Sequence, residues 1–271
     1  MSTVAVCQVE LRVGELAANR AAALSAIEQA AASGAELVVV PELSDSGYVF
    51  SDPAEAAGLA EPADSSLTLE GWAEVARRLG VVVVGGFCEA GEDGRLYNSA
   101  ALVDASGVRS VYRKAHLWDR EKLVFTPGDE APPVVETAVG RVAVMICYDV
   151  EFPEWVRTAA LAGADLVAVP TNEPLAPRPE GERPAEYVKA QAAAVANGVY
   201  VALADRCGAE RGVSWAGVSS VIGPDGYPVV GPPLKESPTV LVATIDAARA
   251  RDKRLGERND VFGDRRVELY S

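Results

Sequence analysis

Histidine, clustered cysteine and long apolar runs are scarce in this sequence. Its 271 residues include a single histidine, His116, and four cysteines, none of them in a Cys-x-x-Cys pair. Zinc sites and dense disulfide frameworks depend on such clusters. We therefore expect no metal and no cofactor, and a reducing cytoplasmic location in which at least one thiol is free to react.

Positive charge is also in short supply. The chain has 25 basic and 39 acidic residues, for a formal net charge of −14, and such a surface repels phosphate backbones and anionic lipid. No apolar run approaches the roughly 20 residues that span a bilayer, and no basic stretch precedes the apolar residues 3–9 as in a signal peptide. We expect no nucleic-acid or membrane partner, and a small-molecule substrate instead.

What is present is an alternation of strand and helix patterns. At 49% hydrophobic and 24% charged residues, the composition is that of an ordinary globular protein. The patterns predict strands at 3–9, 37–40, 81–87, 141–146, 166–169 and 199–204, and helices at 15–32, 67–79, 153–162 and 185–196.

Two regions are predicted to form antiparallel hairpins. The first joins residues 97–103 to 108–113. The second region contains 218–222, a turn at 224–226, and 239–245. With no repeat and no dividing linker, this pattern indicates layered α/β architecture in a single domain, 1–271.

Three reactive side chains each follow a predicted strand. Glu42 comes after residues 37–40, Lys114 directly after the 108–113 strand, and Cys147 directly after the 141–146 strand. Because ligands gather beyond the carboxyl ends of strands in α/β sheets, these side chains could converge.

Their chemistry is compatible with amide hydrolysis. A carboxylate can take the proton of a thiol nucleophile, and an oxyanion needs cationic or N–H donors, which Lys114 and the backbone N–H of Tyr148 could supply. Taken singly, each residue is more typical of a structural role: Cys147 of a small buried residue, Glu42 of a loop carboxylate and Lys114 of a solvated strand end. A cysteine–histidine pair would rest entirely on His116.

Three sequence blocks carry a family resemblance. They are Pro41-Glu42-Leu43 with Ser46-Gly47-Tyr48, Tyr112-Arg113-Lys114-Ala115-His116-Leu117, and Ile146-Cys147-Tyr148-Asp149 with Phe152-Pro153-Glu154. In order and spacing they resemble the signature blocks of the nitrilase, or carbon–nitrogen hydrolase, superfamily. The resemblance also covers Phe125-Thr126-Pro127-Gly128 and Gly263-Asp264-Arg265-Arg266.

The resemblance implies a four-layer αββα sandwich and an amidase mechanism. It implies Glu42 as general base and acid, Lys114 as stabiliser of the tetrahedral intermediate and Cys147 as nucleophile. A second glutamate that positions substrate falls on Glu121, whose alternative is a solvated loop carboxylate. For His116 we favour a supporting hydrogen-bond role over catalysis.

Other residues near these blocks are candidates for the pocket wall, with a core or surface role as the alternative: Tyr48, Trp118, Tyr148, Asn172 and Trp215. Cys7, Cys88 and Cys207 are expected to be structural, the last in a loop.

The sequence after the nucleophile bears on the substrate. Relatives that bind a substrate carboxylate have arginine just after the cysteine, where this chain has Val150 and Glu151. A carboxylate facing Glu151 would meet like charge. The string from Cys147 to Glu154 is similar to amidases of the 5-aminopentanamidase and stereoselective type, so a neutral or cationic amide is expected. An internal salt bridge is the alternative role for Glu151.

Three functional hypotheses follow. The first is an amidase that releases ammonia through a thioester. The second is a nitrilase or N-carbamoyl-amide hydrolase with the same three residues, and the third is a non-catalytic binding protein, which the intact Glu42, Lys114 and Cys147 disfavour. By analogy with the family we expect a homodimer or larger homo-oligomer, with the segment 250–271 at an interface.

Overall fold

A seven-stranded sheet forms one half of the fold in the computed structural model, which describes residues 1–234 and 237–270. The strand order is β10-β1-β2-β3-β4-β5, and β15 also pairs with β1. Strands β1, β2 and β3 are parallel, whereas β4, β5 and β15 run antiparallel to their neighbours. The strands are β1 (Ser2–Glu10), β2 (Leu37–Val39), β3 (Val82–Ala90), β4 (Leu96–Asp104), β5 (Gly107–Arg113), β10 (Arg206–Cys207) and β15 (Thr239–Ile245).

A six-stranded sheet forms the other half. Its order is β14-β13-β9-β8-β7-β6, with β7, β8 and β9 parallel in the middle. The strands are β6 (Val134–Thr137), β7 (Gly140–Val144), β8 (Leu166–Pro170), β9 (Tyr200–Ala204), β13 (Ser220–Ile222) and β14 (Pro228–Val230). A separate two-stranded sheet consists of β11 (Ala209–Glu210) and β12 (Val213–Ser214).

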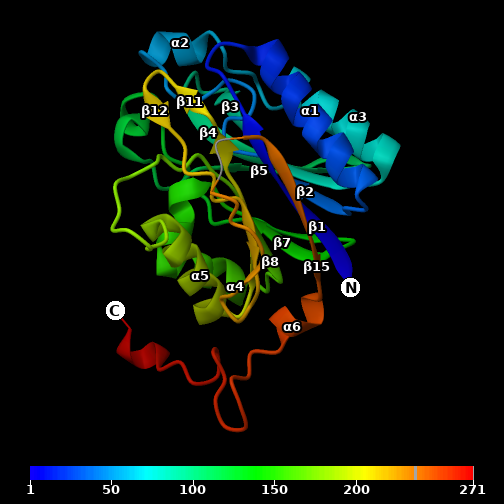
Figure 1. The fold of residues 1–271 in the computed structure, drawn as a ribbon, viewed down its shortest axis with the longest axis vertical. Helices are drawn as coiled ribbons and strands as arrows, with labels where there is room; N and C mark the ends of the chain where they lie inside the picture. Colours follow the sequence, from blue (N-terminus) through cyan, green and yellow to red (C-terminus); the bar gives the residue numbers. More distant parts are fainter. Residues whose placement is uncertain (235–236, 271) are drawn as a thin grey trace.

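Helices cover the outer face of each sheet (Figure 1). Helices α1 (Leu16–Ala32) and α3 (Leu67–Leu79) lie side by side on the first sheet, and α4 (Pro153–Leu161) and α5 (Ala185–Asn197) lie on the second. Shorter helices are α2 (Pro53–Ala57), α6 (Ala247–Arg251) and the 3-10 turns η1 (Asp119–Leu123), η2 (Cys147–Glu151) and η3 (Val267–Leu269). The predicted four-layer αββα sandwich is thus confirmed.

The apolar residues divide into layers that match this architecture. Val6, Val39 and Val84 of the first sheet share a core with Val144 and Ala168 of the second. Separate apolar clusters fill the space between each sheet and its helices. Strands buried on both faces read as continuous apolar runs, which is why the central strands were recognisable in the sequence.

Helix α3 has the end signals that its sequence predicts. The Ser66 side chain accepts a hydrogen bond from the backbone N–H of Leu69 at 3.1 Å, as an N-cap does. Gly80 ends the helix with φ 70°, a left-handed conformation that costs glycine little. The bounds of this helix therefore follow from local chemistry.

Two sequence predictions about local structure were wrong. Strand β13 does form a hairpin, but with β14, whereas β15 crosses to the other sheet and pairs with β1. In that position β15 buries Ala243 and Ile245 between the sheets and packs Val240 and Val242 against the α1–α3 side. Cys207, expected in a loop, lies in β10 beside β1.

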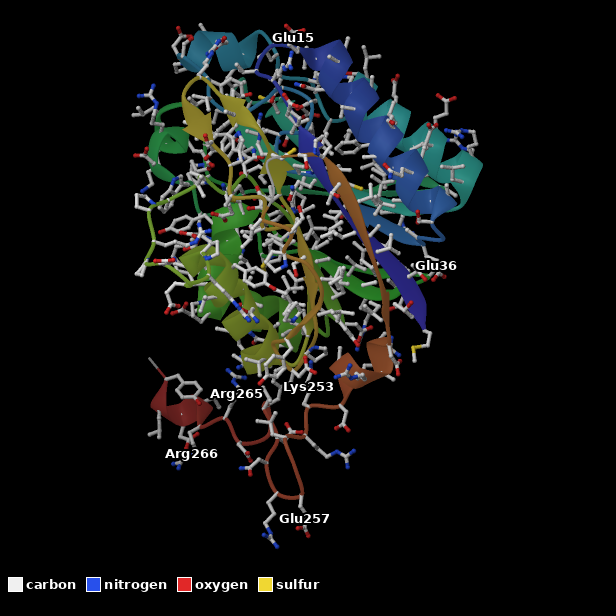
Figure 2. All side chains as sticks on the ribbon, viewed as in Figure 1. Glu15, Glu36, Lys253, Glu257, Arg265 and Arg266 are labelled. Atoms are coloured by element: carbon white, nitrogen blue, oxygen red, sulfur yellow. The ribbon has the colours of Figure 1, made fainter. Side chains whose placement is uncertain are left out.

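The segment beyond α6 extends away from the sandwich (Figures 1 and 2). Its side chains Leu255, Val267, Leu269 and Tyr270 are exposed. The interface role of 250–271 and the single-domain organisation of 1–271 stay predictions. Among the helices of the described residues, none is both long and apolar enough to cross a membrane.

We expect Gly86→Ala to destabilise the fold and disturb Glu42. A Cβ at Gly86 would lie 2.5 Å from the Cα of Glu42, so β3 and the backbone at Glu42 must separate. Overpacking of this kind costs about 1–3 kcal/mol. Thermal unfolding should show a lower Tm and the ammonia-release assay a lower activity.

The matched control is Gly71→Ala in α3, where the added Cβ meets Leu24 at an ordinary 3.7 Å. Replacing a mid-helix glycine by alanine should raise stability by roughly 0.5–1 kcal/mol. A Gly86→Ala protein as stable and as active as the parent would contradict the close approach of β3 to Glu42.

Candidate active site

The carboxyl ends of strands from both sheets converge on one site. Glu42 follows β2 and Lys114 directly follows β5, both in the first sheet. Cys147 opens η2 just after β7, and Asn172 follows β8, both in the second sheet. The Asn172 amide donates to the backbone carbonyl of Glu42 at 3.0 Å and so links the two sheets at this edge.

The Lys114 side chain lies between two carboxylates and is itself not exposed to solvent. Its Nζ is 2.7 Å from Glu42 Oε1 and 2.8 Å from Glu121 Oε1. Burial by itself lowers the pKa of Lys114, but the Glu121 and Glu42 carboxylates outweigh it and raise that pKa well above its ordinary value. Lys114 is therefore a permanent cation in this site.

Glu42 is a buried carboxylate with a raised pKa. Burial raises the pKa of Glu42 to about 7, against the opposing effect of Lys114 and with a further rise from Glu121. The Asn98 amide donates to Glu42 Oε1 at 2.7 Å, while Glu42 Oε2 is buried and accepts no hydrogen bond from the described residues. A carboxylate with this pKa and one free oxygen is suited to exchange a proton near neutral pH.

Cys147 is held in a strained backbone conformation at the start of η2. Its φ of 46° lies in the left-handed region, which costs a non-glycine residue about 1–3 kcal/mol and is concentrated at functional sites. The Cys147 Sγ donates to Glu173 Oε1 at 3.6 Å. Burial, then Glu42 and Glu173, raise the pKa of Cys147 well above its ordinary value although Lys114 opposes them. The resting residue is a thiol.

Glu121 and Tyr48 form one hydrogen-bonded unit beside Lys114. The Tyr48 hydroxyl donates to Glu121 Oε1 at 2.5 Å, and the Glu121 side chain is buried. Glu121 therefore shares the Lys114 ammonium with Glu42 and does not lie on the surface as a solvated loop carboxylate. Its predicted substrate-positioning role stays a prediction.

The loop that carries Tyr48 is fixed by Glu210 and Arg206, which the sequence did not single out, and by the predicted pocket-wall residue Trp215. Glu210 Oε2 accepts hydrogen bonds from the backbone N–H groups of Tyr48 and Val49 at 2.9 and 2.7 Å. Arg206 pairs with Glu210 at 3.1 Å, and the guanidinium lies 4.5 Å from the Trp215 ring centroid. Trp215 packs edge-on against Tyr48 and so supports the pocket wall from behind.

His116 hydrogen-bonds with Asp149. Its Nδ1 is 2.7 Å from Asp149 Oδ1, which also accepts from the His116 backbone N–H at 3.0 Å. Asp149 Oδ2 accepts from the Tyr112 hydroxyl at 2.8 Å and from the Ile146 N–H at 3.2 Å. Asp149 thus joins the chain after Lys114 to the turn that carries Cys147, and His116 is part of that link. The predicted supporting role of His116 agrees with this arrangement.

A small cavity opens onto the thiol. It measures about 60 Å³ and is lined by Trp118, Cys147, Tyr148, Glu151, Asn172, Glu173, Pro174, Ala176 and Glu186. Trp118 and Pro174 also line a neighbouring, mostly apolar cavity of about 320 Å³ that reaches Tyr48 and Glu121. The predicted residues Tyr48, Trp118, Tyr148, Glu151 and Asn172 therefore all border one of these cavities.

Glu151 has both of the environments that the sequence analysis considered, a position facing the pocket and a salt bridge. It lines the cavity beside Cys147 and also hydrogen-bonds with Lys189. Burial, opposed by Lys189, raises the pKa of Glu151. The salt bridge exists, and it does not remove the carboxylate from the cavity.

Glu173 was missed by the sequence analysis, although it contacts Cys147. Its signal was available, because Thr171-Asn172-Glu173-Pro174 directly follows the apolar strand β8, where functional side chains are expected. Glu173 lies near Glu151 and Glu186, and oxygens of the three carboxylates are within 4.8 Å of one another. A cluster of this kind attracts cations, while the expectation that no metal takes part stays a prediction.

Comparison with known proteins agrees with this geometry. A sequence model of the family described as "Carbon-nitrogen hydrolase" matches residues 3–255. A protein named nitrilase from Pyrococcus abyssi is 40% identical over 100% of this chain and 99% of its own length. An (R)-stereoselective amidase from a Pseudomonas species is 35% identical over 97% and 90%.

A solved structure is similar over nearly the whole chain. It is a mutant of the amidase from Nesterenkonia sp. AN1 after Michael addition of acrylamide at its active-site cysteine. It is 31% identical to this chain, has a TM-score of 0.82, and the match covers 99% of this chain and 98% of the other. The resemblance predicted from the three sequence blocks is confirmed, and the chain belongs to the carbon–nitrogen hydrolase family, as a hydrolase of carbon–nitrogen bonds.

Proposed function

We propose that this protein hydrolyses a small neutral or cationic carboxamide to the carboxylic acid and ammonia through an acyl thioester on Cys147. One observation carries the proposal: the buried Lys114 ammonium lies between Glu42 and Glu121 beside the buried Cys147 thiol. Nucleophile, base and cation are the parts that cysteine-based amide hydrolysis requires.

Acylation begins from the protonated thiol. Because the pKa of Cys147 is raised, the thiol proton must leave as the carbon–sulfur bond forms, and the Glu42 carboxylate accepts it. The attacked carbonyl becomes an oxyanion, stabilised by the Lys114 ammonium and the Tyr148 backbone N–H. Glu42 then returns the proton to the amide nitrogen, the carbon–nitrogen bond breaks, and ammonia leaves a thioester on Cys147.

Deacylation uses the same groups in reverse. Glu42 takes a proton from a water molecule, whose oxygen attacks the thioester carbonyl, and Lys114 again stabilises the oxyanion. The carbon–sulfur bond breaks, Cys147 recovers its proton from Glu42, and the carboxylic acid leaves. One water is consumed and one ammonia is released in each cycle.

Surrounding residues would hold this machinery in place. Glu121, fixed by Tyr48, would keep Lys114 oriented and accept a hydrogen bond from the substrate amide. Asn172 would position Glu42 by donating a hydrogen bond to the Glu42 backbone carbonyl. His116 would position the turn that carries Cys147 through its hydrogen bond with Asp149.

Similar proteins support cysteine-based amide chemistry. The Nesterenkonia amidase has been captured with acrylamide added at its active-site cysteine, and another of its mutants carries the acetamide moiety of fluoroacetamide at that cysteine. The name of the Pseudomonas relative, (R)-stereoselective amidase, points to the same reaction.

A nitrilase is the second candidate, because the Pyrococcus abyssi relative has that name. Ammonia release across matched amides, nitriles and N-carbamoyl compounds separates the candidates. We expect the amides to be the best substrates, and a nitrile or carbamoyl preference would replace the proposed reaction.

We further propose that 1–271 acts as one domain and assembles into a homodimer or larger oligomer. The exposed apolar side chains of the C-terminal segment support an interface there. The four buried free thiols are compatible with a cytoplasmic location.

Cys147→Ala should abolish amide turnover, because the proposed mechanism requires the thiol of this residue as the nucleophile. Mass spectrometry of the parent enzyme mixed with amide should find an acyl group on Cys147. The controls Cys7→Ala and Cys207→Ala should retain the chemistry. Turnover by Cys147→Ala close to that of the parent would exclude the thioester route.

Lys114→Met should lower kcat by at least about 10²–10³, the usual cost of one lost oxyanion donor.

Glu42→Gln should slow both acylation and deacylation, which single-turnover measurements resolve. Circular dichroism must show that each variant folds, since Lys114→Met leaves the buried Glu42 and Glu121 carboxylates without their cation and Glu42→Gln leaves Lys114 with Glu121 as its one remaining carboxylate partner among the described residues. A folded Glu42→Gln enzyme with the parent kcat would require another base, with His116 tested next.

Activity should fall as the pH decreases through about 7. Burial raises the pKa of Glu42 to about 7, and only the deprotonated carboxylate can accept the thiol proton. For a neutral amide, kcat/KM should drop about tenfold per pH unit below that value. A profile that stays flat down to pH 5, in enzyme shown to remain folded, would exclude Glu42 as the titrating base.

A further inference from the structure

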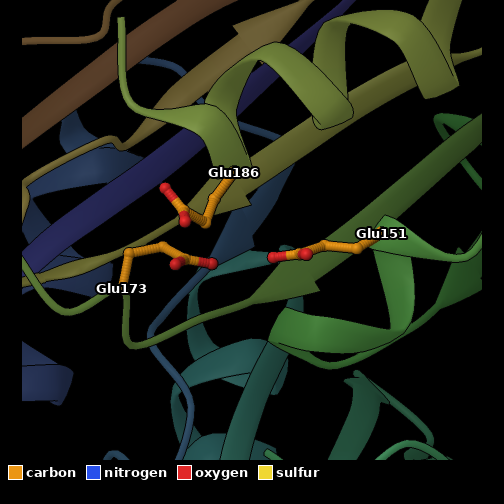
Figure 3. A group of neighbouring side chains, drawn as sticks. All are labelled: Glu151, Glu173 and Glu186. Carbon is orange, nitrogen blue, oxygen red and sulfur yellow. The ribbon is translucent and has the colours of Figure 1, made fainter. Parts of the chain in front are cut away.

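Three carboxylates from separate parts of the chain point toward one another (Figure 3). Glu151 comes from η2, Glu173 follows β8, and Glu186 lies in the first turn of α5. Oxygens of all three lie within 4.8 Å of one another, and all three side chains line the cavity that contains Cys147. The cluster is therefore part of the pocket that an acyl group would enter.

Among the described residues, the three carboxyl groups of the cluster outnumber the cations that form ion pairs with them. Among the described residues, Lys189 is the one cation that forms an ion pair with it, through Glu151. Glu173 is 5% exposed, and its carboxylate accepts from the Thr171 hydroxyl and the Cys147 thiol, both uncharged donors. Burial, then Asp205, Glu186 and Glu151, raise the pKa of Glu173 well above its ordinary value.

An unpartnered acceptor in the same cavity also indicates a donor ligand. Asn172 is 1% exposed, its amide nitrogen donates to the backbone carbonyl of Glu42, and within the part of the chain that the structure describes its Oδ1 accepts no hydrogen bond. Buried polar atoms normally have partners. A ligand with several N–H donors and a positive charge would satisfy Asn172 Oδ1 and Glu173 together.

The short distance between Cys147 and Glu173 limits where a positive charge can lie on the substrate. Cys147 Sγ, which would bond to the reacting carbonyl carbon, is 3.6 Å from Glu173 Oε1. The cavity measures only about 60 Å³, whereas a single water needs roughly 10–15 Å³ of such space. A cationic group bound to Glu173 must therefore be a few bonds from the carbonyl, on a short chain.

We propose that Glu173, together with Glu151 and Glu186, binds the primary ammonium group of a short amino amide and so selects the acyl group. This specificity rests on the proposed amidase function, in which ammonia leaves and any further charge belongs to the acyl side. An ammonium fits better than a metal ion, because the Lys189 ammonium already bonds to Glu151 and the Cys147 thiol to Glu173.

The test compares kcat/KM for four amides at pH 7.5: propanamide, 3-aminopropanamide, 3-carbamoylpropanoate and 5-aminopentanamide. We expect 3-aminopropanamide to exceed propanamide at least about tenfold, as a charge-assisted hydrogen bond implies. It should also exceed the longer 5-aminopentanamide, and the anionic 3-carbamoylpropanoate should be poorest.

Two variants locate the effect. Glu173→Gln and Glu186→Gln should each reduce the ratio of 3-aminopropanamide to propanamide at least about threefold. Using this ratio cancels any general loss of rate, which matters for Glu173 because it contacts Cys147. Glu186 serves as the second variant because it lacks that contact. The control Glu257→Gln removes the same charge from the exposed C-terminal loop (Figure 2) and should leave the ratio unchanged.

The outcomes separate this specificity from the underlying reaction. No turnover of any amide and no acyl group on Cys147 would overturn the proposed function itself. Turnover with equal rates for 3-aminopropanamide and propanamide, or ratios unchanged in both variants, would overturn the ammonium site alone. A preference for 5-aminopentanamide would overturn the short reach. Loss of amino-amide turnover in EDTA, restored by Mg²⁺ or Mn²⁺, would make the cluster a metal site instead.

Discussion

The site depends on one buried cation, the Lys114 ammonium between Glu42 and Glu121. Moving an ammonium or a carboxylate out of water costs several kcal/mol, which only close, well-oriented partners offset. At 2.7 and 2.8 Å the two carboxylates are such partners. Burial, with a smaller contribution from the neighbouring Glu121 carboxylate, raises the pKa of Glu42 to about 7 although Lys114 opposes the rise. This pKa would let Glu42 act as a base near neutral pH in the proposed mechanism. The residues whose ion pairs compensate the buried charges are thus the same residues that the proposed mechanism uses for catalysis.

Much of the surrounding structure keeps that arrangement rigid. Glycine at position 86 lets β3 approach the backbone of Glu42, Glu210 holds the loop of Tyr48, and Asp149 joins the Lys114 segment to the Cys147 turn. Each of these residues acts on a different member of the site. Because Glu42 and Lys114 follow strands of one sheet and Cys147 follows a strand of the other, the site exists only when the two halves of the sandwich have packed together.

The sequence was most informative where local chemistry decides the structure. The predicted bounds of α3 agree with the cap at Ser66 and the left-handed Gly80, and continuous apolar runs marked the central parallel strands. The layers and the strand ends with Glu42, Lys114 and Cys147 could therefore be predicted. The pairing of strands that lie far apart in the sequence could not be predicted. Nothing in the local pattern of residues 239–245 distinguishes pairing with β13 from pairing with β1. The position of Glu173 after an apolar strand was visible in the sequence, but its contact with Cys147 depends on the pairing of β7 with β8. The contact of Tyr48 with Glu121 likewise joins residues whose relation is set only by tertiary packing.

The protonated state of Cys147 has a consequence for how the protein ages. Peroxide and other oxidants react with the thiolate and far more slowly with the neutral thiol. By keeping the pKa of Cys147 high, the buried site protects its sulfur from conversion to sulfinic and sulfonic acids, which thiol reductants do not reverse. In the proposed mechanism, the sulfur becomes reactive only while a bound amide and Glu42 together draw its proton away. We therefore expect the resting protein to withstand exposure to oxidants that would inactivate an enzyme with a preformed thiolate.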